Sequence, residues 1–285
     1  MRQGAIMQSD DLSPRAGGKE IETQQQYAAG LLKGRVAFIT GGATGIGFGI
    51  ARHYVRLGAN VAIASRNQAN LDQAVERLAE EGAGEAIALR TDVRTYDEVR
   101  DSIGKCVKRF GALDILVNNA AGNFLCPTAK LSPNGWRTVL DIDLNGTFYC
   151  CHAGYEALKA SVGGGCIISI ASTQSFTGWP NTAHAAAAKA GIISLSRTLA
   201  VEWGPDNIRV NTISPGPIAD TEGVRRLYEQ SGMAEVQRRR VALGRYGSVQ
   251  DIGNAAVFLA SPLANYVTGA DFIVDGGRWL NYVAV

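Results

Sequence analysis

Three glycines carry the clearest chemical signal in this chain. Gly41, Gly45 and Gly47 stand in TGGATGIGFGIARHYV, directly after the apolar run RVAFIT (35–40) and at the start of a segment with helical spacing. Glycine at a strand-to-helix turn lets the backbone come close to a pyrophosphate, which then binds at the helix N-terminus. The pattern therefore predicts a dinucleotide site, and a tight turn without a ligand is the alternative.

A second signal is the pair Ser65-Arg66 at the end of the next apolar run, about 20 residues further on. An NAD site usually places an acidic residue here, which binds the ribose 2′-hydroxyl. No Asp or Glu occurs from Val61 through Arg66, and a guanidinium beside a hydroxyl would bind a 2′-phosphate. The pair predicts NADPH as the cofactor, against the alternative that Arg66 is a solvated surface arginine.

These residues must be positioned by the alternation of strands and helices that follows Lys33. Apolar runs typical of buried parallel strands alternate with segments of helical spacing, such as LDQAVERLAEEG, which we expect to end at Gly82 as its C-cap. The strand candidates are residues 35–40, 60–65, 85–91, 113–118, 165–171, 208–214 and 271–275. The pattern predicts an α/β fold, with a single Rossmann-type, doubly wound, parallel seven-stranded sheet and helices on both faces.

One domain is expected, because no linker follows residue 34. Residues 33–285 would form the NADP-binding domain, with a helical substrate insert near 219–245 where the alternation breaks. Residues 1–32 are polar and indicate an N-terminal tail or docking arm. Their acidic residues, Asp10, Asp11 and Glu20, argue against an Arg-rich, acid-poor transit peptide.

Composition excludes several classes of partner. A net charge of +2 does not indicate a nucleic-acid partner, and no apolar run approaches the roughly 20 residues of a membrane span. The five cysteines show neither CxxC nor Cys/His metal spacing, so we expect reduced thiols and no metal site. The C-terminal NYVAV is not a Ser-Lys-Leu-type signal. A bacterial-type cytoplasm is expected, with a peroxisome reached without that signal as the alternative.

The glycine turn, together with NNAAGN (118–123), SPGP (214–217) and VDGG (274–277), resembles the short-chain dehydrogenase/reductase family over residues 33 to 280. The resemblance implies that Asp92 and Val93 flank the adenine and that Lys189 bonds the nicotinamide ribose. The full cofactor set that the glycine turn, the Ser-Arg pair and the resemblance imply is Gly41, Thr44, Gly45, Ile46, Gly47, Ser65, Arg66, Asp92, Val93, Asn119, Ala120, Lys189, Pro215, Gly216, Ile218 and Thr221.

The catalytic set of that family is only partly present. Ser172 and Lys189 match its serine and lysine, but Ala185 stands four positions before the lysine, where the family has its tyrosine. Asp143 falls where the family's asparagine usually stands, and Asn145 follows two residues later. In the family the tyrosine donates a proton to a carbonyl oxygen. Ordinary carbonyl chemistry is therefore in doubt.

A narrower resemblance accounts for the missing tyrosine. The stretches AAGNFLCP (120–127), DIDLNGTF (141–148) and PGPIADTEGVRRL (215–227) are similar to peroxisomal-type 2,4-dienoyl-CoA reductases, which also lack the tyrosine and have Asp in the asparagine position. The resemblance implies NADPH-dependent reduction of a 2,4-dienoyl-CoA to a 3-enoyl-CoA in β-oxidation of unsaturated fatty acids. Hydride goes to C5, and the dienolate is protonated at Cα, so no phenol beside a carbonyl is required.

The residues expected to carry this chemistry are Asp143, Lys189, Ser172 and Asn145. Asp143, with Lys189, would position the water that supplies the proton, while Ser172 and Asn145 would orient it or bind the thioester oxygen, as could Asn119. A helix-capping or subunit-interface role is the alternative for Asp143. His184 is a second candidate acid, although adjacent helical positions point about 100° apart.

The same resemblance implies a path for coenzyme A and an oligomer. The substrate residues it implies are Arg66, Arg94, Phe124, Ser132, Pro133, Asn134 and Arg226. A solvated helix face is the alternative for Arg226, and core packing is the alternative for Phe124. A homotetramer is expected, packed through helices around 133–162 and 184–203. Two other functions stay open: a short-chain oxidoreductase acting on another carbonyl or hydroxyl substrate, and a catalytically silent NADP-binding protein.

Overall fold

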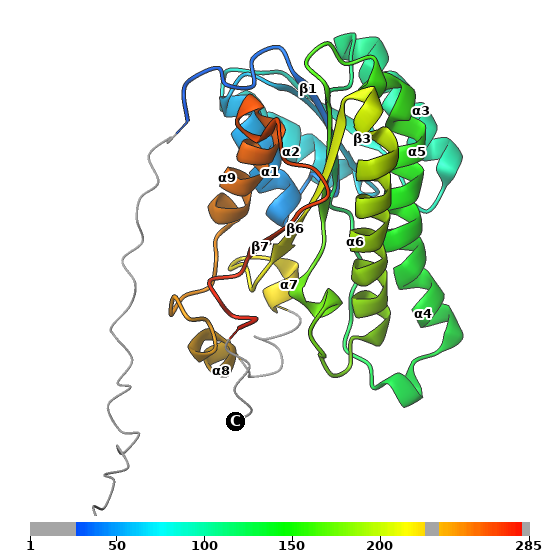
Figure 1. Ribbon diagram of the computed structural model, residues 1–285, viewed down its shortest axis with the longest axis vertical. Coiled ribbons are helices and arrows are strands. Elements are labelled where there is room, and N and C mark those ends of the chain that lie inside the picture. Colours follow the sequence, from blue (N-terminus) through cyan, green and yellow to red (C-terminus); the bar gives the residue numbers. More distant parts are fainter. Residues whose placement is uncertain (1–26, 226–233, 281–285) are drawn as a thin grey trace, which may run out of the picture.

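The computed structural model describes residues 27–225 and 234–280, which form one parallel sheet between two layers of helices (Figure 1). The strand order is β3-β2-β1-β4-β5-β6-β7. The strands are β1 (Val36–Thr40), β2 (Asn60–Ser65), β3 (Ala86–Arg90), β4 (Ile115–Asn118), β5 (Gly165–Ile170), β6 (Ile208–Pro215) and β7 (Asp271–Val274). The seven-stranded, doubly wound fold predicted from the sequence is confirmed, strand by strand.

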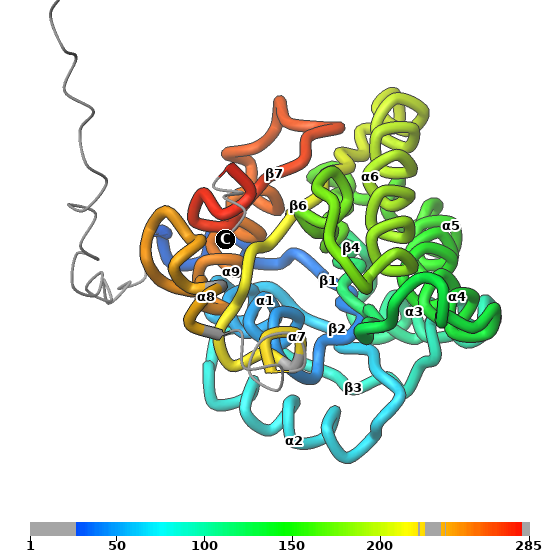
Figure 2. Tube along the Cα trace, turned by 90° about the horizontal axis from the view of Figure 1, so that it is seen from below, coloured from blue at the N-terminus to red at the C-terminus, as the bar shows by residue number. Residues whose placement is uncertain are grey.

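The helices divide between the two faces of the sheet (Figure 2). On one face lie α1 (Gly45–Arg56), α2 (Gln68–Ala79) and α9 (Val249–Ala260), and on the other lie α3 (Tyr96–Phe110), α5 (Gly146–Lys159) and α6 (Ala183–Trp203). Strand β1 shows why: Ala37 and Ile39 pack into the first layer, and Val36 and Phe38 into the second. Successive strand residues point to opposite faces, so a strand buried on both sides is apolar throughout.

Local signals set several helix ends. Helix α4 (Pro133–Leu140) begins where the Ser132 hydroxyl accepts a hydrogen bond from the Gly135 N–H at 3.0 Å, with proline at the first helical position. Helix α2 ends at Ala79, before the glycine expected to cap it. Gly82, with φ +85°, instead makes the left-handed turn toward β3.

The segment after β6 contains two short helices, α7 (Glu222–Val224) and α8 (Ala234–Arg239), within the helical insert predicted near 219–245. Figure 1 shows α7 below β6 and α8 further down. None of the helices in residues 27–225 and 234–280 combines the length and hydropathy needed to cross a membrane.

Candidate active site

The glycine turn between β1 and α1 forms a close-packed floor at the carboxyl end of the sheet. Gly41 (φ +62°) and Gly45 (φ +54°) adopt left-handed conformations, and a Cβ on Gly47 would lie 2.4 Å from the Gly41 carbonyl oxygen. The Asn119 side-chain amide donates to the carbonyls of Thr40 at 3.0 Å and Gly41 at 3.1 Å. The turn thus needs glycine, and Asn119, which directly follows β4, holds it in place. The turn also presents the N-terminus of the 12-residue helix α1, which has no acidic residue in its first turn. This cradle suits a pyrophosphate.

A side cavity of about 230 Å³ opens beside this turn, at the ends of β1, β2 and β3. Its lining is Gly41, Thr44, Ala64, Ser65, Arg66, Thr91, Asp92, Val93, Ala120, Ala121 and Ile142. Seven residues of the predicted cofactor set therefore share one cavity: Gly41, Thr44, Ser65, Arg66, Asp92, Val93 and Ala120.

The two arginines at this end differ in their surroundings. Arg94 Nε donates to both oxygens of Asp92, at 2.9 and 3.1 Å, and this guanidinium holds the pKa of the Asp92 carboxyl below its usual range. Arg66 is exposed and lines the cavity directly. Pairing with Arg94 offsets the negative charge of Asp92 beside the cavity, so the local field favours an anion near Arg66.

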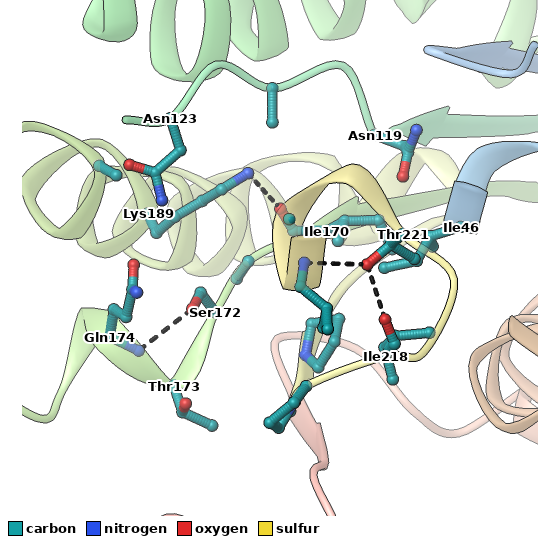
Figure 3. A pocket seen from close by; sticks show the side chains of 18 of the residues that line it. Ile46, Asn119, Asn123, Ile170, Ser172, Thr173, Gln174, Lys189, Ile218 and Thr221 are labelled. Carbon is teal, nitrogen blue, oxygen red and sulfur yellow. Dashed lines mark hydrogen bonds between the residues drawn. The ribbon is translucent and has the colours of Figure 1, made fainter. Parts of the chain in front are cut away.

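A central cavity of about 230 Å³ lies next to the side cavity, and Ala121 lines both. Figure 3 shows it enclosed by segments that follow β4, β5 and β6. Its lining is Ile46, Asn119, Ala121, Asn123, Asp143, Ile170, Ala171, Ser172, Thr173, Gln174, Trp179, Ala185, Lys189, Pro215, Gly216, Pro217, Ile218, Thr221, Gly223, Val224 and Arg278. The other cofactor residues of the set, apart from Gly45 and Gly47 in the turn, are among them.

Asp143 and Lys189 form the charged centre of this cavity. Asp143 lies in a π-helical turn, Asp141–Asn145, that links α4 to α5; such turns often occur at functional sites. Lys189 Nζ lies 3.3 Å from Asp143 Oδ2 and donates to the Ile170 carbonyl at 2.8 Å. Both side chains are almost fully enclosed, with 1% of Asp143 and 8% of Lys189 exposed.

Burial raises the pKa of the Asp143 carboxyl above its usual range, although Lys189 and the Gly122 N–H partly oppose the shift. The Gly122 N–H donates to Asp143 Oδ1 at 2.7 Å. A carboxyl whose pKa is raised keeps its proton to a higher pH than usual and is therefore a better candidate for a general acid. Asp143 lies within a π-helical turn and its side chain lines the cavity, which favours a role in the cavity over the helix-capping alternative.

Ser172 and Ala185 both line this cavity. The Ser172 hydroxyl accepts from the Gln174 N–H at 3.2 Å, which leaves its own proton available to a ligand. Ala185, in the first turn of α6, adds only a methyl group where a tyrosine would project. The cavity therefore keeps open space near Lys189 and Ser172.

Other predicted residues lie outside the central cavity. The Asn145 amide donates to Asp141 Oδ1 at 2.7 Å and does not line the cavity. Ser132, Pro133 and Asn134 are exposed at the start of α4, where Ser132 caps the helix and the other two form its first positions. Phe124 packs its ring edge on His184. Arg226 lies outside the described residues.

Several cavity residues were not predicted from the sequence. Asn123, in the stretch AAGN after β4, could have been predicted, because polar residues that follow parallel strands meet at one edge of the sheet. No sequence pattern indicates that Trp179 and Arg278 line the cavity, because they come from distant segments. In the structure the Arg278 guanidinium stacks on the Trp179 ring at 4.1 Å. Gln174 and Val224 likewise depend on how the loops fold over the site.

The glycine turn, the sheet order and the lysine-centred cavity define a nicotinamide-dependent short-chain reductase architecture. A family model described as enoyl-(acyl carrier protein) reductase matches residues 41–278. The chain belongs to the short-chain dehydrogenase/reductase family, and it is an oxidoreductase of that family.

The relatives to which the chain is similar include proteins named as 2,4-dienoyl-CoA reductases. The chain is 43% identical over 256 residues to the peroxisomal 2,4-dienoyl-CoA reductase ((3E)-enoyl-CoA-producing) of Pongo abelii, covering 90% of this chain and 87% of that protein. It is 41% identical over 248 residues to a protein of Bacillus subtilis (strain 168) named "probable 2,4-dienoyl-CoA reductase ((2E)-enoyl-CoA-producing)", covering 87% and 97%. A short chain dehydrogenase structure from Bacillus anthracis has 39% identity and a TM-score of 0.80, covering 89% and 100%.

Proposed function

We propose that this chain reduces 2,4-dienoyl-CoA thioesters to 3-enoyl-CoA with NADPH, without a catalytic tyrosine. One observation carries the proposal: the buried pair Asp143 and Lys189 lines a cavity in which Ala185 leaves the tyrosine position empty. An acid and a cation are thus available without a phenol. Relatives named as dienoyl-CoA reductases support the substrate class.

The two cavities and the glycine turn between them support this choice of cofactor. We assign the pyrophosphate to the Gly41–Gly47 turn, the adenosine end to the side cavity with Ser65 and Arg66, and the nicotinamide end to the central cavity with Lys189. When bound, the cofactor supplies a hydride to the substrate. The side chains present at each end match the groups they would hold.

The chain's own residues would stabilise the negative charge that forms on the thioester oxygen and would supply the proton to Cα. Hydride addition at C5 of the dienoyl thioester moves electrons through the diene onto the thioester oxygen. The Ser172 hydroxyl is free to donate to this oxygen, and the Lys189 ammonium stabilises the developing negative charge. A water held by Asp143 gives its proton to Cα, and the hydroxide left behind takes the Asp143 proton. Protonation at Cα leaves the 3-enoyl product.

A direct assay tests this proposal. The purified protein should oxidise NADPH in the presence of 2,4-hexadienoyl-CoA, with equal loss of the nicotinamide and conjugated-diene absorbance. Enoyl-CoA hydratase added to the product distinguishes the isomers, because it hydrates a 2-enoyl but not a 3-enoyl thioester. Tight NADPH binding without turnover would favour the silent NADP-binding protein, and reduction of simple ketones instead would favour the carbonyl oxidoreductase.

The cofactor preference gives a separate prediction for Arg66. Because a hydrogen bond to a charged group contributes about 1.5–3 kcal/mol, Arg66→Gln should weaken NADPH binding about 10- to 100-fold and leave NADH binding nearly unchanged. Titration of each cofactor by fluorescence measures both constants. Arg100→Gln is the matched control, since Arg100 is exposed on α3 and pairs with Asp97. Tighter binding of NADH than NADPH by the wild-type protein would contradict the assignment.

A homotetramer also belongs to the proposal. Phe148 on α5 is 45% exposed, and Trp136 on α4 is exposed as well. Large aromatic side chains on the surface often mark interfaces, and both lie in the 133–162 region expected to pack between copies. Light scattering of the purified protein measures the assembly. A location in a bacterial-type cytoplasm stays a prediction.

A further inference from the structure

Three neighbouring residues hold polar atoms that are buried and receive no hydrogen bond. Among the described residues, Asn123 Oδ1, Asp143 Oδ2 and both ring nitrogens of His184 are in this state. Asp143 Oδ2 has only its ion pair with Lys189. Buried polar groups without partners are rare and call for an explanation, such as bound water or a catalytic role.

His184 is the least expected of the three. It lies in the first turn of α6, is 0% exposed, and precedes the cavity-lining Ala185. The Phe124 ring packs edge-on against its imidazole, with centroids 4.3 Å apart and planes at 82°. Phe124 itself is 38% exposed. A single aromatic side chain therefore covers this side of the imidazole.

One loop connects His184 to the catalytic pair. Gly122 donates its N–H to Asp143, Asn123 lines the central cavity, and Phe124 packs on His184. Figure 3 shows Asn123 and Lys189 both directed toward the cavity. A charge on His184 also acts on the Asp143 carboxyl, whose pKa it lowers. Phe124 therefore links His184 to the loop that also holds Asn123 and the Gly122 N–H bonded to Asp143.

We propose that His184 returns a proton to Asp143 after each turnover, through water bound between His184, Asn123 and Asp143. A buried water needs about two to four polar partners, and Asn123 Oδ1, Asp143 Oδ2 and one ring nitrogen of His184 supply three that lack a hydrogen bond. In the step, the imidazolium N–H bond breaks, water passes a proton on, and an O–H bond forms on the Asp143 carboxylate. The neutral imidazole regains its proton from solvent when the Phe124 side chain moves.

This inference rests on the proposed reduction, in which Asp143 loses one proton per product. His184 acts through Asp143 and does not touch the substrate, so its loss should not slow a first turnover. Only later turnovers need a new proton on Asp143. A role in packing alone would slow the first and later turnovers alike.

Stopped-flow reduction of 2,4-hexadienoyl-CoA separates the two. In His184→Ala, preloaded with NADPH, we expect a first turnover at the wild-type rate followed by steady turnover about 10²-fold slower. Added imidazole should restore the steady rate, because the deleted ring leaves space of its own size. His184→Gln, which can bind water but cannot carry a proton, should stay slow. His152→Ala is the control, since that histidine is exposed on α5 and bonds Tyr96.

The outcomes are distinct. Absence of reduction by the wild-type protein would overturn the proposed function. With an active wild type, equal slowing of all turnovers in His184→Ala and no response to imidazole would overturn the relay, as would full steady activity of His184→Gln.

Discussion

Asp143→Asn should lower turnover of 2,4-hexadienoyl-CoA by about 10²- to 10⁴-fold, the usual contribution of a positioned acid or base. Asparagine has nearly the same shape and can still accept the Gly122 hydrogen bond at Oδ1. It cannot release a proton to water. NADPH binding, measured by fluorescence titration, should change little, because Asp143 lies outside the glycine turn to which we assign the pyrophosphate.

The neighbouring carboxylate provides the control for this substitution. Asp141 belongs to the same π-helical turn, but it accepts a hydrogen bond from Asn145 and does not line the cavity. Asp141→Asn should therefore keep most of the activity. Equal activity of wild type and Asp143→Asn would remove Asp143 from the mechanism and leave Lys189 and Ser172 as the groups that deliver the proton.

The raised pKa of Asp143 also predicts a pH profile. The acid form is the one that supplies a proton, so turnover should fall as pH rises through that pKa, at a pH above the usual range of aspartic acid, near 4. The nearby Lys189 ammonium lowers the pKa of Asp143. In Lys189→Met, any residual turnover should therefore fall at a still higher pH than in the wild type. A limb that moves to lower pH would contradict the assignment.

The fold was predictable because its signals are local. Each strand is a short run such as 60–65, apolar because both faces are buried, and strand β2 spans those same residues. The glycines of the turn after β1 are visible in the sequence, and two of them, Gly41 and Gly45, have left-handed φ in the structure. Helix ends were harder to predict. Helix α2 ends at Ala79 rather than at Gly82, because its end depends on how residues 80–82 pack and not on the helical pattern alone.

The site was predictable only in part, for a physical reason. Residues that directly follow parallel strands, such as Asn119 and Ser172, meet at one edge of the sheet whatever the loops do. Asn145 was expected near the lysine, but the π-helical turn directs Asp143 inward and pairs Asn145 with Asp141. Arg278 and Trp179 come together from segments about 100 residues apart, and no periodicity encodes such a contact.

Ala185→Tyr tests whether the absent tyrosine is a requirement of this substrate or a neutral loss. Ala185 is buried in the wall of the central cavity, one helical turn from Lys189. In the proposed binding mode, a phenol there would occupy space that the planar diene needs beside the nicotinamide. Overfilling a closed site costs about 1–3 kcal/mol, so dienoyl-CoA turnover should fall about 5- to 150-fold.

Cofactor binding and a smaller substitution complete this test. NADPH affinity should persist in Ala185→Tyr, because the turn and the side cavity are unchanged, and Ala185→Ser should retain wild-type turnover because it leaves the space open. Unimpaired dienoyl-CoA turnover in Ala185→Tyr would mean that the diene does not use this space. New reduction of a simple ketone by that variant would show that Ser172 and Lys189 still support carbonyl chemistry. The identity of residue 185 would then decide which substrate is reduced.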